Sequence, residues 1–561
     1  MHHAMHPLFF IYILPMNLLW LDLNCSFAHS SLALPALHAN ACDKVPDVVW
    51  MSHSATINES PTVIASDIYT YAPDVLACTC WLFTRDVLLP VLDRVHALLP
   101  SCKIVLGGPE FLDDNKEFLL NHPFIHCVFR GEGEESFAAW LQVSHDRHQW
   151  NTISGLCYFD SEGLYHDNGF ARVSSFSSLP SPESSSFFNW SKPFVQLETT
   201  RGCFNTCSFC VSGGDKPVRS LPIEKVRSRL QLIRSHGIKE IRLLDRTFNF
   251  NKRYACQLLD LFLEFPDMHF HLEIHPALLS SELRARISTL PHGLLHLEAG
   301  IQSLHQNVLD ESHRLGKLED ALDGLKFLCS LDNTVTHVDL IAGLPHYTLM
   351  QIFDDVCMLA SLRADEIQLE LLKVLPGTDM RRRASSLGLV FSPTPPYEIL
   401  ATPSISPKEL QRSHQLSRLL DFYYNTESWQ SVFRDLLLNY PDFLSSFLDH
   451  LIRIHVIDQP LALDRRGVIL YEFCKQYYPD SLHLVVCAWL EGGHSLKKQP
   501  AEYVRTKHIE SPSVWDIDYG SYTESLRLCL LDMPGLSYLV WYGYDSQSQK
   551  PKPVFKAHSL R

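Results

Sequence analysis

Short apolar runs alternate with amphipathic stretches through the first quarter of the chain. Residues 18–23 and 103–106 are nearly continuous apolar runs, which are typical of strands buried on both faces, and a further strand is predicted at residues 74–79. Residues 87–99 place apolar side chains at helical spacing. This alternation predicts an α/β domain over residues 16–145 with a doubly wound, Rossmann-like parallel sheet.

The same alternation returns after a linker. Residues 146–190 contain a predicted hairpin around Ser161-Glu162-Gly163 and a stretch rich in Ser and Pro, which is typical of a linker. In the following domain, residues 191–400, strands are predicted at 195–199, 240–245, 269–274, 294–299, 336–342 and 366–374, with helices between them. Six strand–helix units predict a partial (β/α)6 barrel, in which chemistry takes place at the carboxyl ends of the strands.

The last part of the chain, residues 401–561, carries no metal-binding or nucleophile motif. Residues 410–424 and 433–453 have helical apolar periodicity, whereas the end is aromatic and irregular in pattern. We therefore expect a mainly helical C-terminal domain.

Composition narrows the class of protein. The 561 residues are 46% hydrophobic and carry a net charge of −15, with a pI near 6.0, which argues against a general nucleic-acid-binding surface. The 16 cysteines are unevenly spaced and mostly stand inside apolar stretches, as reduced core thiols do. We expect a reducing, cytoplasmic location.

The apolar N-terminus resembles a signal peptide or membrane anchor only at first sight. Pro15 interrupts the run from residue 7 to residue 23, and no Lys or Arg precedes it. We expect residues 1–15 to be an extension with no structural role, and we expect no membrane association.

Three cysteines with the spacing Cys203-x-x-x-Cys207-x-x-Cys210 carry the chemistry. Three thiolates this close can bind three irons of a 4Fe-4S cluster and leave the fourth iron open to a ligand. Chance clustering, or three of the four ligands of a structural zinc, are the alternatives. Gly202 suits a tight turn before the first thiol.

With this motif the chain resembles the radical S-adenosylmethionine (SAM) enzymes. The resemblance implies that SAM binds the open iron and is cleaved by one electron to a 5'-deoxyadenosyl radical. It also implies an electron donor such as flavodoxin or ferredoxin. Phe204 and Thr206 depart from the Pro and the basic residue that are common in related enzymes, but neither position is a ligand.

Candidate SAM contacts follow from the same resemblance, because they stand at predicted strand ends in the expected order. Asp245 follows the second strand and would face the methionyl amine. Glu298 and Gln302 end the fourth strand and suit hydrogen bonds to ribose and carboxylate. Gly343 follows the fifth strand and would allow the backbone to approach adenosine.

A second pair of motifs stands in the N-terminal domain. Gly107 and Gly108 end one strand, and the segment Arg130-Gly131-Glu132-Gly133-Glu134-Glu135 follows another. Ahead of a cluster motif, this pair resembles the cobalamin-binding domains of radical SAM enzymes, and it implies cobalamin as a cofactor. The motif Asp-x-His-x-x-Gly is absent, and His29 lacks that context. We therefore expect no protein histidine on cobalt.

The resemblance extends over most of the chain. Residues 245–249, 372–378 and 396–398 are similar to the cobalamin-binding-domain radical SAM proteins that carry a C-terminal domain of unknown function. This implies a cobalamin-dependent radical enzyme, with methyl transfer to an unreactive carbon or phosphorus of a small-molecule or unknown substrate as the first hypothesis. A rearrangement or sulfur insertion, or a non-catalytic iron-sulfur sensor, are the alternatives. The sequence identifies no catalytic side chain.

Overall fold

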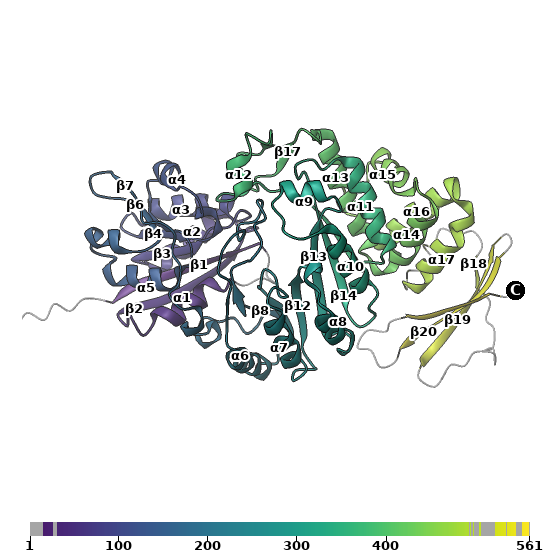
Figure 1. The fold of residues 1–561 in the computed structure, drawn as a ribbon, viewed down its shortest axis with the longest axis horizontal. Helices are drawn as coiled ribbons and strands as arrows, with labels where there is room; N and C mark the ends of the chain where they lie inside the picture. Colours follow the sequence, from purple (N-terminus) through teal and green to yellow (C-terminus); the bar gives the residue numbers. More distant parts are fainter. Residues whose placement is uncertain are drawn as a thin grey trace, which may run out of the picture. The chain divides into compact units, whose positions relative to one another are not determined.

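Figure 1 shows the fold in a computed structural model. It describes residues 15–25, 31–492, 494 and 498, and the backbone of residues 504–506, 522–533, 536–545 and 553–559. Residues 1–14 of the predicted extension, and His29, lie outside the described residues. The chain divides into two compact units. Unit 1 comprises residues 1–297, 309–317 and 372–403, and unit 2 comprises residues 298–308, 318–371 and 404–561.

Unit 1 begins with a seven-stranded sheet in the order β2-β1-β3-β4-β5-β6-β7. Its strands are β1 (Met16–Asn24), β2 (Val48–Thr56), β3 (Val75–Thr79), β4 (Lys103–Gly107), β5 (Ile125–Phe129), β6 (Leu156–Phe159) and β7 (Tyr165–Asp167). The first five run parallel, and β6 and β7 form the predicted hairpin at the edge. The strand order reverses between β1 and β3, where open α/β sheets bind ligands.

Helices cover both faces of this sheet (Figure 1). They are α1 (Ala33–Ala41), α2 (Pro61–Tyr71), α3 (Arg85–Leu98), α4 (Lys116–Asn121) and α5 (Gly133–Val143). Consecutive residues of β1 point to opposite cores, with Leu18 and Trp20 in one and Leu19 and Leu21 in the other. The doubly wound fold that was predicted from these apolar runs is confirmed.

A second sheet has the order β15-β14-β13-β12-β11-β8. Its strands are β8 (Phe194–Leu197), β11 (Glu240–Leu243), β12 (His269–Ile274), β13 (Leu295–Gln302), β14 (Val335–Ala342) and β15 (Glu366–Leu371). The helices between them are α6 (Ile223–Ser235), α7 (Lys252–Phe262), α8 (Ser281–Ser288), α9 (Gln306–Glu311), α10 (Leu318–Cys329) and α11 (Leu349–Ser361). The predicted repeat of six strand–helix units is confirmed. Within it, β13 passes from unit 1 into unit 2.

The C-terminal part of unit 2 is mainly helical, as predicted. It contains α13 (Pro407–Leu419), α14 (Glu427–Asn439), α15 (Phe443–Arg453), α16 (Leu463–Tyr477) and α17 (Leu482–Glu491). The predicted helix over residues 433–453 is in fact two helices, because Pro441 lacks the N–H that a continuous helix needs.

The end of the chain, whose sequence pattern is irregular, contains strands that the sequence analysis did not predict. An antiparallel sheet, β18 (Val504–Thr506), β19 (Tyr522–Met533), β20 (Leu536–Asp545) and β21 (Pro553–Ser559), follows the helices. Its long strands are rich in aromatic and apolar residues, a composition that favours strands. The domain boundaries drawn from the sequence stay predictions.

Two further observations concern the described residues only. None of their helices is both long and apolar enough to cross a membrane. All fifteen cysteines whose side chains are described are free thiols.

Candidate functional site

The three-cysteine loop lies in unit 1 between β9 (Thr200–Arg201) and β10 (Arg219–Ser220), which pair antiparallel and close its base. Gly202 has a φ of +98°, and a Cβ there would lie 2.5 Å from the Asp215 carbonyl oxygen. The amide of Cys203 donates to that same carbonyl at 3.0 Å. Only glycine therefore allows the chain to turn into the first thiol as it does here.

The three thiols share one small space. Cys203 and Cys207 are buried and Cys210 is half-buried. Burial is the main cause that raises the pKa of Cys207 and of Cys210, and the other two thiols of the loop add to the rise at Cys207. Thiols whose charges act on a neighbouring thiol in this way suit a shared cation or cluster, which would hold them as thiolates.

A possible hydrogen-bond donor lies beside each sulfur. The Ser212 amide donates to Cys210 Sγ at 3.4 Å, and Arg314 Nη1 donates to Cys207 Sγ at 3.4 Å. The hydroxyl of Thr247 lies 3.8 Å from Cys203 Sγ. Hydrogen bonds to sulfur tune the properties of iron-sulfur centres.

Residues 310–316, here called the strap, bring Arg314 to the loop from far along the sequence. The Ser208 amide donates to the Ser312 carbonyl at 2.9 Å. The Leu315 amide donates to the side-chain oxygen of Asn205 at 3.0 Å. These bonds alternate between the two segments and fix the strap against the loop.

One pocket of about 660 Å³ joins the cluster loop to the first sheet within unit 1. The sheet contributes strand ends and turns, including Thr79, Gly107, Gly108 and Gly131, and the loop contributes Gly202, Ser212, Gly213 and Gly214. Aromatic side chains line it as well, namely Trp20, Trp81, Phe129, Phe137 and Phe170. No histidine is among the described residues that line this pocket.

The predicted glycines line the pocket for two different reasons. A Cβ at Gly107 would meet only Phe129 Cβ at 3.8 Å, an ordinary contact. Gly108 has a φ of +108°, and a Cβ there would lie 2.7 Å from the Cys80 carbonyl oxygen. Gly108 is therefore required by the turn itself, whereas Gly107 leaves its free space to the pocket.

The Arg130–Glu135 segment contributes ion pairs at the wall of the pocket. Arg201, directly before the cluster loop, contacts Glu134 at 2.9 Å and Glu198 at 2.7 Å. Glu132 accepts a hydrogen bond at 3.0 Å from Arg219, which lies on β10 at the base of the loop. These pairs are largely buried, so each side chain depends on its partner for solvation.

Asp245 is fully buried and does not line the pocket. Its carboxylate accepts hydrogen bonds from the amides of Thr199 and Thr200, each at 2.8 Å, and from the Thr199 hydroxyl. Burial raises its pKa to about 6. Its SAM contact stays a prediction, and the observed bonds fasten the end of β8 to β11.

The other predicted SAM contacts lie in unit 2. Burial is the main cause that raises the pKa of Asp339 on β14, and the charge of Glu298 on β13 adds to the rise, whereas the hydrogen bond and charge of His337 lower it. Gln302 has a φ of +73°, which is unusual for a residue with a side chain, and Gly343 has a φ of +90°. Strained backbone at strand ends is typical of ligand sites, but these SAM roles stay predictions.

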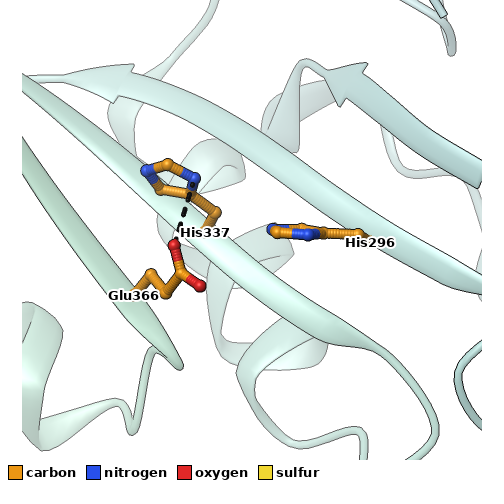
Figure 2. Close-up of side chains that lie close together, drawn as sticks. All are labelled: His296, His337 and Glu366. Atoms are coloured by element: carbon orange, nitrogen blue, oxygen red, sulfur yellow. Dashed lines mark ion pairs between the residues drawn. The ribbon is translucent and has the colours of Figure 1, made fainter. Parts of the chain in front are cut away.

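His337 lies beside two carboxylates in this part of unit 2. Its Nε2 lies 3.2 Å from Asp339. Its Nδ1 lies 3.7 Å from Glu366, and a dashed line marks this ion pair in Figure 2. His296, also drawn there, stands on β13. Although burial lowers it, the pKa of His337 is raised overall by the carboxylates of Asp339, Glu298 and Glu366.

Comparison with known proteins agrees with this geometry. Residues 197–356 match the radical SAM superfamily, and residues 385–481 match a protein family of unknown function, DUF4080. The cobalamin-dependent radical SAM methyltransferase TokK of Streptomyces tokunonensis is 23% identical over 55% of this chain and 48% of its own length. The chain thus spans about half the length of this curated relative.

Two solved structures have the same fold. The cobalamin-dependent SAM radical enzyme OxsB aligns over 87% of this chain and 82% of its own, with a TM-score of 0.60 and 14% identity. The radical SAM methyltransferase TsrM of Kitasatospora setae, with cobalamin and a 4Fe-4S cluster bound, aligns over 71% and 81%, with a TM-score of 0.52 and 16% identity.

The fold is thus that of the cobalamin-dependent radical SAM enzymes, as was predicted. Within it, this chain carries a radical SAM domain followed by a DUF4080 region.

Arg314 and Arg201 are site residues that sequence reasoning missed. Arg314 stands far from the cysteines in the sequence, and an isolated arginine has no pattern that marks it. For Arg201 a signal existed, because it directly precedes Gly202 and the cysteine motif. Its partners Glu132 and Glu134 stand in a glycine-rich turn, and no sequence pattern pairs them with Arg201.

Proposed function

We propose that the protein is a cobalamin-dependent radical SAM enzyme that transfers a methyl group to a small-molecule substrate. The observation that carries the proposal is the single pocket whose wall contains both the glycine-rich strand ends of the first sheet and the cysteine loop. A corrinoid and a cluster-bound SAM could meet there within one pocket.

The residues fit both groups. Cys203, Cys207 and Cys210 offer three sulfur ligands and leave one iron open. Gly107 leaves room against the backbone at the carboxyl edge of the sheet, and no histidine is among the described residues of the pocket wall. The cluster supplies one-electron cleavage of SAM, and cobalamin supplies a methyl group for transfer.

The chain's own residues hold and shield this site. Gly202 and Gly213 set the path of the cysteine loop, and the pairs of Arg201 with Glu134 and of Arg219 with Glu132 hold its base against the first sheet. Trp20, Phe129 and Phe137 exclude water from the sheet side of the pocket. The observed bonds of Asp245 keep the two strand ends beside the loop in register.

The electron that the reaction needs would come from a donor such as flavodoxin or ferredoxin. A cytoplasmic location fits this donor class, and the free thiols of the described residues favour a reducing compartment.

The experiment is an anaerobic reconstitution with iron and sulfide followed by a SAM cleavage assay. Changing Cys207 to Ala should remove most cluster iron and all 5'-deoxyadenosine formation, because the cluster loses one of three sulfur ligands. Cys256→Ala is the matched control, since Cys256 is also buried but stands on α7, outside the loop. It should keep both properties.

Three results would argue against the proposal. Full iron loading of the Cys207→Ala protein would exclude this cluster. A loaded wild-type protein that releases no 5'-deoxyadenosine from SAM would favour a sensor. SAM cleavage without any retained corrinoid would exclude cobalamin-dependent methyl transfer.

A further inference from the structure

The contact between Arg314 and Cys207 is a charged hydrogen bond to a cluster ligand. Arg314 Nη1 lies 3.4 Å from Cys207 Sγ, within the distance of a hydrogen bond to sulfur. Cys207 is buried, so the guanidinium acts on the sulfur through a medium that screens charge weakly. The arginine thus favours negative charge on this sulfur.

The strap holds the guanidinium there. The Thr206 hydroxyl donates to the His313 carbonyl at 3.0 Å, so the strap is bonded to the loop on the residue directly before Arg314. The amide of Arg314 donates to the Leu309 carbonyl at 2.9 Å, which closes the turn that begins the strap. The geometry of the charged group is therefore set by backbone bonds on both sides of it.

An ion pair between side chains holds the other end of the strap. Arg383 on α12 (Asp379–Arg383) pairs with Glu311 and lies 3.7 Å from Asp379. The amide of Met380 on the same helix donates to the Ser208 carbonyl of the cluster loop at 2.7 Å. Loop, strap and α12 hence form one connected structure within unit 1.

We propose that Arg314 is a positioning residue that raises the reduction potential of the cluster bound by Cys203, Cys207 and Cys210. The inference rests on the proposed cluster. On reduction, one electron from a low-potential one-electron donor enters the cluster and adds one negative charge. A guanidinium bonded to a ligand sulfur stabilises this added charge and makes the reduction easier.

The loss of this charge should shift the reduction potential of the cluster by a measurable amount. Arg314→Met keeps a long side chain but removes both the donor and the charge. We expect its cluster to be reduced with an equilibrium constant about tenfold smaller, which for one electron corresponds to ~59 mV toward more negative potential. Arg314→Lys keeps the charge with different geometry and should lie between the two.

The test is an anaerobic redox titration of the reconstituted full-length protein, followed by electron paramagnetic resonance, with dithionite as the reductant. SAM is left out, so that an effect on SAM binding cannot move the midpoint. Arg286→Met is the matched control, because Arg286 on α8 makes exposed ion pairs with Asp260 and Glu282. Its midpoint should equal that of the wild type.

The outcomes separate the two proposals. Should the Met variant lose its cluster, Arg314→Gln, which keeps a donor without charge, takes its place, and a midpoint lower than that of the wild type supports the inference. Loaded variants with unchanged midpoints overturn the inference and leave the proposed function standing. A wild-type protein that binds no cluster overturns both.

Discussion

At the scale of single residues, Gly107 and Gly108 differ in what a side chain would meet. Gly108 is required by its own backbone, since a Cβ there would collide with the Cys80 carbonyl. At Gly107 a Cβ finds ordinary contact, and larger groups would extend into space that the pocket leaves open. Substitution at Gly107 therefore tests the pocket without breaking the turn.

We expect Gly107→Val to abolish retention of hydroxocobalamin, because its two branches would occupy the surface against which the corrinoid is proposed to lie. Gly107→Ala should retain an intermediate amount. The measurement is the corrinoid absorbance that remains after gel filtration, with iron content as the control for the cluster. Equal retention in the wild type and the Val variant would exclude this position as a contact.

Asp245 is the second informative residue, since its carboxylate satisfies three donors without contact to solvent. Its folded pKa of about 6 lies above the ordinary value of 3.8, so the folded protein binds the proton more tightly than the unfolded chain does. The contribution of Asp245 to stability is therefore full below pH 4 and decreases as the pH rises to 6.

Asp245→Asn keeps the size of the side chain and cannot be charged. As the pH rises from 4 to 6, the wild type should lose stability relative to this variant. The difference in the free energy of unfolding should change by on the order of 2 kcal/mol in favour of the variant. Urea unfolding of the apo-protein at several pH values measures the difference. Asp245→Ala should destabilise at every pH, because it leaves buried donors unpaired, at about 1–3 kcal/mol each. A difference between Asn variant and wild type that does not change with pH would contradict the assignment.

At the scale of elements, the cluster loop depends on two neighbouring glycines in unequal ways. A Cβ on Gly213 would lie 2.4 Å from the Cys207 carbonyl oxygen, whereas a Cβ on Gly214 would meet nothing within 4 Å. Gly214 has a φ of +80°, so its substitution strains only its own backbone.

We expect Gly213→Ala to displace the Cys207 segment at a cost of about 1–3 kcal/mol and to lower cluster retention sharply. Gly214→Ala should cost about 1–2 kcal/mol of backbone strain and keep the cluster. Iron and sulfide content per protein chain, after anaerobic reconstitution, distinguishes the two. Equal loss in both variants would mean that strain, and not contact with Cys207, controls the loop.

The sequence was sufficient for elements whose pattern is local. The strand at residues 269–274 has the predicted bounds, because apolar spacing and burial agree there. It was insufficient for β2, in which polar residues interrupt the apolar ones, and for the sheet at the end. The cysteines could be found by their spacing, whereas Arg314 could not, since only the folded chain brings it to Cys207.

At the scale of the whole molecule, the net charge of −15 sets a general limit on partners. Nucleic acids repel such a surface unless a local basic patch compensates. We expect no salt-dependent binding of bulk transfer RNA at physiological ionic strength, measured by filter binding. Binding that weakens steeply with added salt would contradict this expectation and would indicate a local basic surface.

The strap bears on when the cluster can be inserted during synthesis of the chain. The ribosome releases the cysteines long before it releases Arg314 and Met380, and both later residues bond to the cysteine loop. In a nascent chain that ends at Leu297, the cysteine loop would lack its bonds to the strap and to α12. Delivery of iron and sulfide should therefore follow the release of residue 380, which makes cluster assembly in this loop a late step of synthesis or a later one.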